Sequence, residues 1–213
     1  MIKTIESNLI IAENGLDKEN ELKVKSNAFV QLMNIYSQAI KEVEKEINKI
    51  DKEKNLIDHI KTRIKSPKSI INKMNSKNYA LTYQNLIENI NDIAGIRIIT
   101  SSKTDVYIIK KLIEKNTNMV ILKEKDYIAK PKKSGYMSLH LIVEVPLNIK
   151  EQIVFVKAEI QIRTTAMDLW SNLEHEIKYK PKDKVSRLAS KKLIKYAKML
   201  NKIETEMTKM YNM

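Results

Sequence analysis

The sequence of 213 residues contains no cysteine, which excludes disulfide bonds and any chemistry that depends on a thiolate. It has no apolar run of the length that a membrane span needs, and residues 1–15 lack the basic start and long apolar middle of a signal peptide. Only three glycines and four prolines are present, so loops should be few and short. We therefore expect a cytoplasmic protein without a membrane partner, long enough to build a hydrophobic core.

Basic residues are in clear excess. Lys and Arg number 39 against 26 for Asp and Glu, a formal net charge of +13. Such an excess favours polyanionic partners, namely nucleotides, nucleic acid or anionic lipid. A general bias toward Lys, Asn and Ile along the chain explains the same excess, so the positions of particular cations must identify the ligand.

Hydrophobic periodicity predicts helices at both ends of the chain and a strand-rich middle. Residues 1–25, which include Gly15, suggest a short helix or a loosely held extension, and helical spacing then runs from Phe29 to Ile50. Strands are expected at 57–66, 96–100, 119–125, 138–145 (closed by Pro146) and 153–164, and helices at 67–74, 79–90, 105–115, 165–180 (stopped by Pro181) and 184–212. The order indicates an α/β protein with a mixed sheet: an N-terminal helical extension (1–55), a core (56–182) and a C-terminal helix (183–213).

The first candidate site is a basic cluster in DHIKTRIKSPKSIINKM. Arg63 and Lys65 are two apart, so on a strand they share a face. Ser69 and Lys73 lie one helical turn apart at the start of the next helix, where free backbone N–H groups favour an anion. These groups suit a di- or triphosphate, although a solvated basic face explains them equally well.

The second candidate site is a pair of acidic residues. Asp92 precedes an apolar strand, and Glu159, Gln161 and Arg163 share one face of another strand. Polar side chains on one face of an apolar strand should line a cleft, because their unpaired burial is costly. Two carboxylates that face each other form a Mg²⁺ site. The structural alternative is an ion pair between Glu159 and Arg163 or between Asp92 and Arg97.

The third candidate site is KPKKSGYMSLH. Tyr136, Ser138 and His140 alternate onto one face where a strand begins, and Lys132 precedes Tyr136 by four. An aromatic ring beside cations suits a purine base with its phosphates, although a surface hairpin is the alternative. Two phosphate-type sites beside an acid pair indicate phosphoryl-group transfer between two nucleotides. No Walker loop, GxGxxG or kinase signature occurs.

Four ordered segments between residues 59 and 180 resemble the synthetase domain of the RelA/SpoT homologues, the (p)ppGpp synthetases, and above all their small alarmone synthetases. The segments are RIKSPKSIINKM, NDIAGIRI, KDYIAKPKKSGYMSLH and AEIQIRTTAMDLWSNLEHEIKYK. The resemblance implies a nucleotidyltransferase-like sheet of about five strands, and an enzyme (GTP pyrophosphokinase) that transfers pyrophosphate from ATP to the 3′-hydroxyl of GTP, GDP or GMP. It also implies Mg²⁺, with Mn²⁺ as the alternative ion, and a homotetramer.

The resemblance also implies a role for each candidate residue. Arg63, Lys65, Ser69 and Lys73 would bind the ATP phosphates, Lys77 would also contact ATP, and Arg97 would stack on adenine. Asp92 and Glu159 would hold Mg²⁺, and Glu159 would also accept the proton of the 3′-hydroxyl. Lys125, Lys132, Tyr136, Ser138, His140, Gln161, Arg163, Asp168, Glu174 and His175 would bind the acceptor, with Tyr136 stacked on guanine and Asp168 accepting from its N–H groups.

Two departures from the family pattern are visible. Thr62 stands where the family often has glycine before the first arginine, and Ser76 stands where a second base-stacking arginine is usual, with Lys77 next to it. In family members regulated by bound alarmone, the segment ahead of the first arginine joins a site between subunits, and IDHIKT matches that segment poorly, which argues against allosteric activation by (p)ppGpp. Two other functions stay open: a toxic relative that pyrophosphorylates adenosine nucleotides or the 3′ end of tRNA, and a non-catalytic module that binds alarmone or single-stranded RNA.

Overall fold

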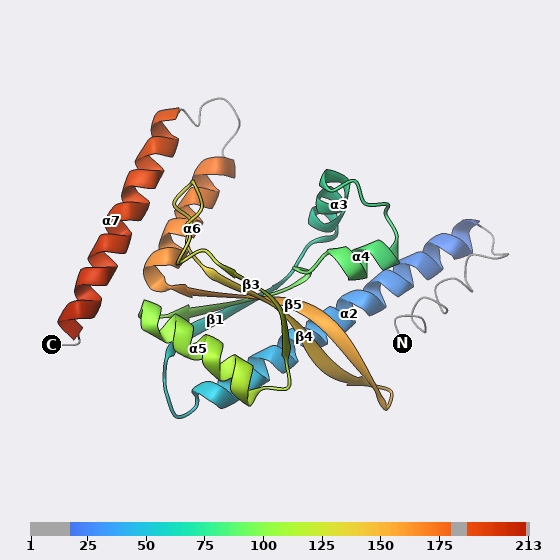
Figure 1. Cartoon of the computed structure of the whole chain (residues 1–213). Coiled ribbons are helices and arrows are strands. Elements are labelled where there is room, and N and C mark those ends of the chain that lie inside the picture. Colours follow the sequence, from blue (N-terminus) through green and yellow to red (C-terminus); the bar gives the residue numbers. More distant parts are fainter. Residues whose placement is uncertain (1–17, 180–186, 212–213) are drawn as a thin grey trace.

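A five-stranded mixed sheet forms the centre of the molecule (Figure 1). The computed structural model describes residues 18–179 and 187–211. The strands are β1 (Ile57–Ile64), β2 (Ala94–Thr100), β3 (Val120–Asp126), β4 (Leu139–Ile149) and β5 (Gln152–Thr164), in the spatial order β1-β2-β5-β4-β3. The central pair β2–β5 is parallel, and the other neighbouring pairs are antiparallel. The expected α/β class with a mixed sheet is confirmed.

The helices confirm the expected order of elements. They are α2 (Lys18–Asp51), α3 (Pro67–Ser76), α4 (Tyr83–Asn89), α5 (Lys103–Asn116), α6 (Thr165–Tyr179) and α7 (Arg187–Tyr211). Side-chain caps fix three of the starts: Ser66 accepts from the backbone of α3, Thr82 from that of α4, and Ser102 forms a capping box with Asp105 in α5. Within the described ranges, no helix has the length and apolar character to cross a membrane.

The core lies on the face of the sheet that α2 and α5 cover (Figure 1). Every second residue of a strand points into this core. Ile160 and Ile162 of β5 are examples, and both are fully buried. Val43 and Ile47 of α2, together with Ile109 of α5, pack against them in one hydrophobic cluster. Burial of this apolar surface is the main stabilising contribution to the fold. It also makes the sheet a rigid platform for its opposite face.

The opposite face of the sheet carries the polar side chains. The register places Arg63 of β1 opposite Gly95 of β2, and Gly95 opposite Glu159 of β5. His140 of β4 lies opposite Gln161 of β5. Helices α3 and α4 stand on one side of this face, and α6 and α7 stand on the other (Figure 1). Alternate side chains of a strand point to the same face, and the register aligns neighbouring strands, so polar residues from four strands lie on one surface.

Several details of the expected secondary structure were wrong. Helix α4 begins at Tyr83 rather than at Tyr79, because Thr82 caps it. Helix α2 begins at Lys18, well before Phe29. Strand β4 continues through Pro146 to Ile149, because β3 ends its pairing at Glu144 and leaves this part of β4 with one open edge, where proline is tolerated. Tyr136 and Ser138 precede β4, which begins at Leu139. The expectations for residues 1–17, 180–186 and 212–213, including Gly15 and the stop at Pro181, lie outside the described residues.

Candidate active site

A cleft of about 270 Å³ opens on the polar face of the sheet. Its lining residues come from β1, β2, β5 and the turn before β2: Lys61, Thr62, Arg63, Asp92, Gly95, Ile96, Arg97, Glu159 and Gln161. Five of these nine were candidate residues from sequence: Arg63, Asp92, Arg97, Glu159 and Gln161. The cleft therefore brings together the basic cluster and the acid pair, which are about 100 residues apart at their extremes.

Asp92 lies between two lysines of the basic cluster. Lys65 Nζ donates a hydrogen bond of 3.1 Å to Oδ2, and Lys73 Nζ lies 2.8 Å from Oδ1. Burial by itself would raise the pKa of Asp92, but the hydrogen bonds and charges of Lys73 and Lys65 lower it below its ordinary value. Asp92 is therefore an anion at neutral pH. It does not form the alternative ion pair with Arg97, which binds Asp168 instead.

Glu159 belongs to a closed ring of five hydrogen-bonded side chains. The ring runs Glu159–His140 (3.2 Å), His140–Tyr136 (2.7 Å), Tyr136–Arg163 (2.6 Å), Arg163–Gln161 (2.8 Å) and Gln161–Glu159 (2.8 Å). A carboxylate only accepts, so His140 Nδ1 donates to Glu159, and the Nε2 of a neutral imidazole accepts from the hydroxyl of Tyr136. Each member fixes the orientation of the next, and the alternative ion pair between Glu159 and Arg163 does not form.

The ring keeps Glu159 ionised. Burial by itself would raise the pKa of Glu159, but the hydrogen bonds from His140 and Gln161 lower it below its ordinary value. The negative charge of Asp92 acts in the opposite direction, which places the two carboxylates within electrostatic reach of each other. The cleft thus contains two anionic oxygen donors, one in the turn before β2 and one on the adjacent strand β5.

This donor set fits a divalent cation that arrives with a nucleotide. No group of three or more acidic or histidine side chains suited to a metal occurs in residues 18–179 and 187–211. Mg²⁺ needs no such protein cage, because it is commonly held by one or two carboxylates together with substrate phosphates and water. Asp92 and Glu159 could supply the two carboxylates, and the cations around them suit phosphate groups. Arg63 is exposed at the mouth of the cleft.

Asp168, in the first turn of α6, joins three basic residues of the sheet. Its Oδ1 accepts from Arg97 (2.8 Å) and Arg163 (3.3 Å), and its Oδ2 accepts from Lys61 (3.0 Å). Burial would raise the pKa of Asp168, but these three cations lower it. Asn172, one turn later, also donates to Oδ2. Both oxygens have protein partners, so a contact with guanine requires one of these bonds to be exchanged, and that role stays a prediction.

The aromatic part of the site is more enclosed than the sequence suggested. Tyr136 is only 9% exposed, and Lys132 Nζ lies 4.7 Å from the centre of its ring. Stacking of a base on Tyr136 therefore requires Lys132 to leave the ring. Ser138 has no exposed surface, and its hydroxyl contacts Ile162 O (3.3 Å) and Arg163 Nε (3.4 Å). A contact between Ser138 and a nucleotide would require this buried side chain to become accessible, so that role stays a prediction.

Five other candidate residues do not line the cleft. Lys125 of β3 is opposite His140 in the sheet register, so it is beside the acceptor candidates. Ser69 is in the first turn of α3 and receives a 2.9 Å hydrogen bond from Ser66, and Lys77 follows the last residue of α3. Glu174 is buried and His175 is exposed, both on α6. The structure leaves the roles of these five residues as predictions.

Two residues were missed by the sequence reasoning. Lys61 lines the cleft and binds Asp168, and the alternation Lys61–Arg63–Lys65 was the signal that could have found it. The ring of Tyr127 packs edge-on to His140 (5.2 Å between ring centres) and lies under Lys132 Nζ (4.5 Å). No sequence pattern marks Tyr127, because its position depends on the turn between β3 and β4.

Comparison with known proteins gives a consistent result. Over residues 62–184 the chain matches the family described as "Region found in RelA / SpoT proteins", a range that includes every residue of the cleft except Lys61. GTP pyrophosphokinase YwaC of Bacillus subtilis (strain 168) is 42% identical over 146 residues, which cover 68% of this chain and 70% of that protein. GTP pyrophosphokinase YjbM of the same strain is 34% identical over 146 residues, 68% of each chain.

Solved structures show the same fold. Small alarmone synthetase 2 from Bacillus subtilis superposes with a TM-score of 0.80 at 37% identity, covering 86% of this chain and 98% of that one. Small alarmone synthetase 1 from Bacillus subtilis, solved bound to its product pppGpp, gives a TM-score of 0.77 at 29% identity, covering 86% and 96%. The likeness therefore extends beyond the sheet to the flanking helices.

Proposed function

The chain belongs to the RelA/SpoT family, and we propose that it is a small alarmone synthetase, a GTP pyrophosphokinase of the stringent response. It would transfer the β,γ-pyrophosphate of ATP to the 3′-hydroxyl of a guanosine nucleotide and release AMP. The observation that carries the proposal is the cleft itself, in which two anionic carboxylates lie between two separate groups of cations. This arrangement suits two phosphorylated substrates and one divalent ion.

The donor nucleotide is assigned to the β1–α3–β2 side of the cleft. Arg63, Lys65 and Lys73 would bind its phosphates, and displacement of the lysines from Asp92 would free that carboxylate for the ion. Ser69 and Lys77 would add contacts along α3. Arg97 lines the cleft and would stack on adenine. This is the sole base-stacking arginine of the assignment, since Ser76 stands where the family usually has a second.

Asp92 and Glu159 would hold Mg²⁺, with Mn²⁺ as the alternative ion, together with phosphate oxygens. When bound, the ion neutralises charge on the transferred group and helps align the two substrates. The remaining contribution of the protein is positioning. Its cations are held in place before the substrates arrive, so little reorganisation is needed during the reaction.

The acceptor nucleotide is assigned to the β3–β4–α6 side. Lys125, Lys132 and His140 would meet its phosphates, and Gln161 and Arg163 would steady the ribose and the transferred group. Tyr136 would stack on guanine once Lys132 moves from its ring to a phosphate. Asp168, Glu174 and His175 are the further contacts assigned on α6.

Glu159 is the assigned base. The 3′-oxygen of the acceptor forms a bond to the β-phosphorus, the bond from this phosphorus to the bridging oxygen of the α-phosphate breaks, and AMP leaves with that oxygen. The proton of the hydroxyl passes to Glu159, which is ionised before the reaction. Its low pKa makes it a weak base, so proton transfer should accompany formation of the bond to phosphorus, when the hydroxyl becomes acidic.

A product assay tests the proposal. Protein incubated with Mg²⁺, ATP and GTP, GDP or GMP should release AMP and form the 3′-pyrophosphorylated guanosine nucleotide. Glu159→Gln should lower kcat by about 10²–10⁴-fold, the range for loss of a general base. Glu144→Gln is the matched control, because Glu144 lies on a neighbouring strand and does not line the cleft. Full activity of Glu159→Gln would refute the assignment.

The same assay separates the other functions. Labelled product on adenosine nucleotides or on the 3′ end of tRNA, without a guanosine product, would replace the proposed acceptor. No AMP release with any acceptor, combined with salt-sensitive binding of single-stranded RNA, would indicate a binding module. A cytoplasmic location and a homotetramer belong to the proposal through the family, and size-exclusion chromatography with light scattering tests the second.

A further inference from the structure

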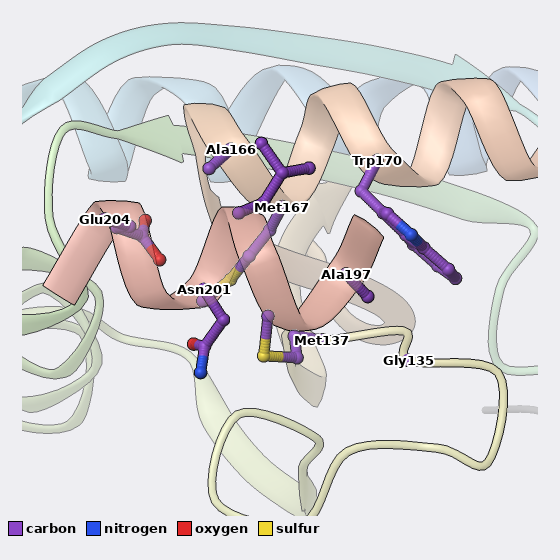
Figure 2. Close-up of a pocket in the computed structure, with 9 residues that line it drawn as sticks. Gly135, Met137, Ala166, Met167, Trp170, Ala197, Asn201 and Glu204 are labelled. Atoms are coloured by element: carbon purple, nitrogen blue, oxygen red, sulfur yellow. The ribbon is translucent and has the colours of Figure 1, made fainter. Parts of the chain in front are cut away.

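A second, smaller hydrophobic cluster joins the acceptor side of the site to the C-terminal helix. Its buried members are Tyr136, Trp170 of α6, and Leu193 and Ala197 of α7. Figure 2 shows α7 beside α6, with Ala197 directed toward the loop that carries Gly135. This cluster is separate from the main core under the sheet. Its one member in the proposed active site is Tyr136.

Gly135 brings the loop into close contact with α7. A Cβ atom on Gly135 would lie 2.5 Å from Ala197 Cβ and 3.8 Å from Ile194 Cα, so the loop backbone lies directly against the helix. Its φ of +91° is a conformation that favours glycine. A hydrogen bond of 2.8 Å from Gly135 N to Lys132 O closes the turn that presents both Lys132 and Tyr136.

Trp170 packs on the other side of the contact between the loop, α6 and α7, which we call the junction. Its Nε1 donates a 3.1 Å hydrogen bond to Leu193 O, and its ring meets the ring of Tyr136 at 6.5 Å between centres. The cavity between the loop, α6 and α7 measures only about 10 Å³. That is about the room for one water molecule, so the junction cannot absorb a larger side chain without movement.

We propose that α7 positions the acceptor-binding loop, acting through the contact of Ala197 with Gly135 and through Trp170. The inference rests on the proposed function and adds a positioning element to it. A shift of Gly135 moves Tyr136, whose hydroxyl orients Arg163 and His140 in the ring around Glu159. The donor side of the cleft is built from β1, α3 and β2, whereas the three atoms nearest to a Cβ on Gly135 belong to Ala197, Trp170 and Ile194.

Substitution of Ala197 by leucine tests this role. The larger side chain has to push the loop away, and overpacking of this kind costs about 1–3 kcal/mol. We expect the KM for the guanosine nucleotide to rise about tenfold, which corresponds to about 1.4 kcal/mol, while the KM for ATP changes less than about twofold. Lys198→Leu is the matched control, because it adds the same side chain at the next, exposed position of α7.

A second measurement uses the unmodified protein. Trp170 is the sole tryptophan of the chain and is 4% exposed, so its emission reports on the junction without direct contact with a ligand. With excitation at 295 nm, saturating GTP should change the emission of Trp170, and ATP alone should change it much less. Ala197→Gly loosens the contact between α7 and Gly135, so it should reduce the change in Trp170 emission that GTP causes. This variant replaces Ala197→Leu as the test if Ala197→Leu does not fold.

The outcomes separate the two proposals. Absence of AMP release by the wild-type protein would overturn the proposed function. Normal alarmone synthesis, with an acceptor KM in folded Ala197→Leu within about twofold of Lys198→Leu, would overturn the role of α7 alone. Equal increases in both KM values would also overturn it, since general destabilisation does not discriminate between the two substrates. The role of α7 would also be overturned if the emission of Trp170 did not change at a GTP concentration that supports turnover.

Discussion

The hydroxyl of Tyr136 offers the sharpest test of the site, because Tyr136→Phe removes it and keeps the ring. The hydroxyl accepts from Arg163 at 2.6 Å and contacts His140 Nε2 at 2.7 Å. Arg163 is only 2% exposed, so water cannot replace the lost partner of its guanidinium. A hydrogen bond to a charged group contributes about 1.5–3 kcal/mol. We therefore expect the free energy of unfolding to fall by about 2 kcal/mol.

Thermal unfolding at fixed protein concentration measures this effect. For a chain of this size about 2 kcal/mol lowers Tm by about 4–8 °C. Tyr127→Phe is the control: its ring packs beside the same histidine, and among the described residues its hydroxyl makes no hydrogen bond. It should change stability by less than about 0.5 kcal/mol. If Tyr136→Phe were as stable as Tyr127→Phe, the ring of five hydrogen bonds would be refuted.

Kinetics then separate the hydroxyl from the aromatic ring. Tyr136→Phe should lower kcat, because Arg163 and His140 lose a common anchor, while the KM for the acceptor changes little. Tyr136→Ala removes the stacking surface as well, and base stacking contributes about 1–3 kcal/mol. It should raise the acceptor KM about 5–150-fold and leave the ATP KM nearly unchanged. A larger effect on the ATP KM would mean that the two nucleotide sites are exchanged.

Three further predictions concern charge. The pKa of Asp92 is lowered in the folded protein, so its ionised form adds stability above about pH 4, and this stability is lost as the pH falls through the folded pKa. Asp92→Asn should therefore be less stable than the wild type at pH 7. Urea titrations should show that this difference in stability shrinks below about pH 4. Asp168→Ala leaves buried Arg163 without its carboxylate and should cost about 3–5 kcal/mol in urea unfolding, whereas Lys61→Ala, whose side chain is 51% exposed, should cost under about 1 kcal/mol. Removal of divalent ions with EDTA should abolish AMP release, and addition of Mg²⁺ or Mn²⁺ should restore it. The Mg²⁺ concentration needed for half-maximal activity should be at least about tenfold higher in Asp92→Asn, which corresponds to about 1.4 kcal/mol.

Periodicity was a reliable guide to the elements of this fold. The alternation of Glu159, Gln161 and Arg163 with buried isoleucines correctly assigned them to one polar face, because side chains of a strand point to opposite sides in turn. The same rule applied to Lys61 would have added that residue to the cleft. The end of β4 was misplaced, since proline stops a strand only where its missing N–H is needed for pairing.

The sequence did not predict which side chains bind one another across the sheet. Asp92 binds Lys65 and Lys73 rather than Arg97, because the turn before β2 places its carboxylate between Lys65, just before α3, and Lys73, in the last turn of α3. Ser138 looked like a ligand contact from its spacing with Tyr136, yet packing against β5 buries it completely. Spacing tells which face a side chain is on, and only the neighbouring elements decide whether that face is open.

By itself the sequence determined the order of helices and strands, the polar face of the sheet and the family, because these depend on local periodicity and on short motifs. The tertiary structure alone decided the closed ring around Glu159, the three cations on Asp168 and the contact of Gly135 with Ala197. Each of these joins residues distant in the chain through distances of a few ångströms. Such contacts follow from register and helix packing, which no single segment of sequence contains.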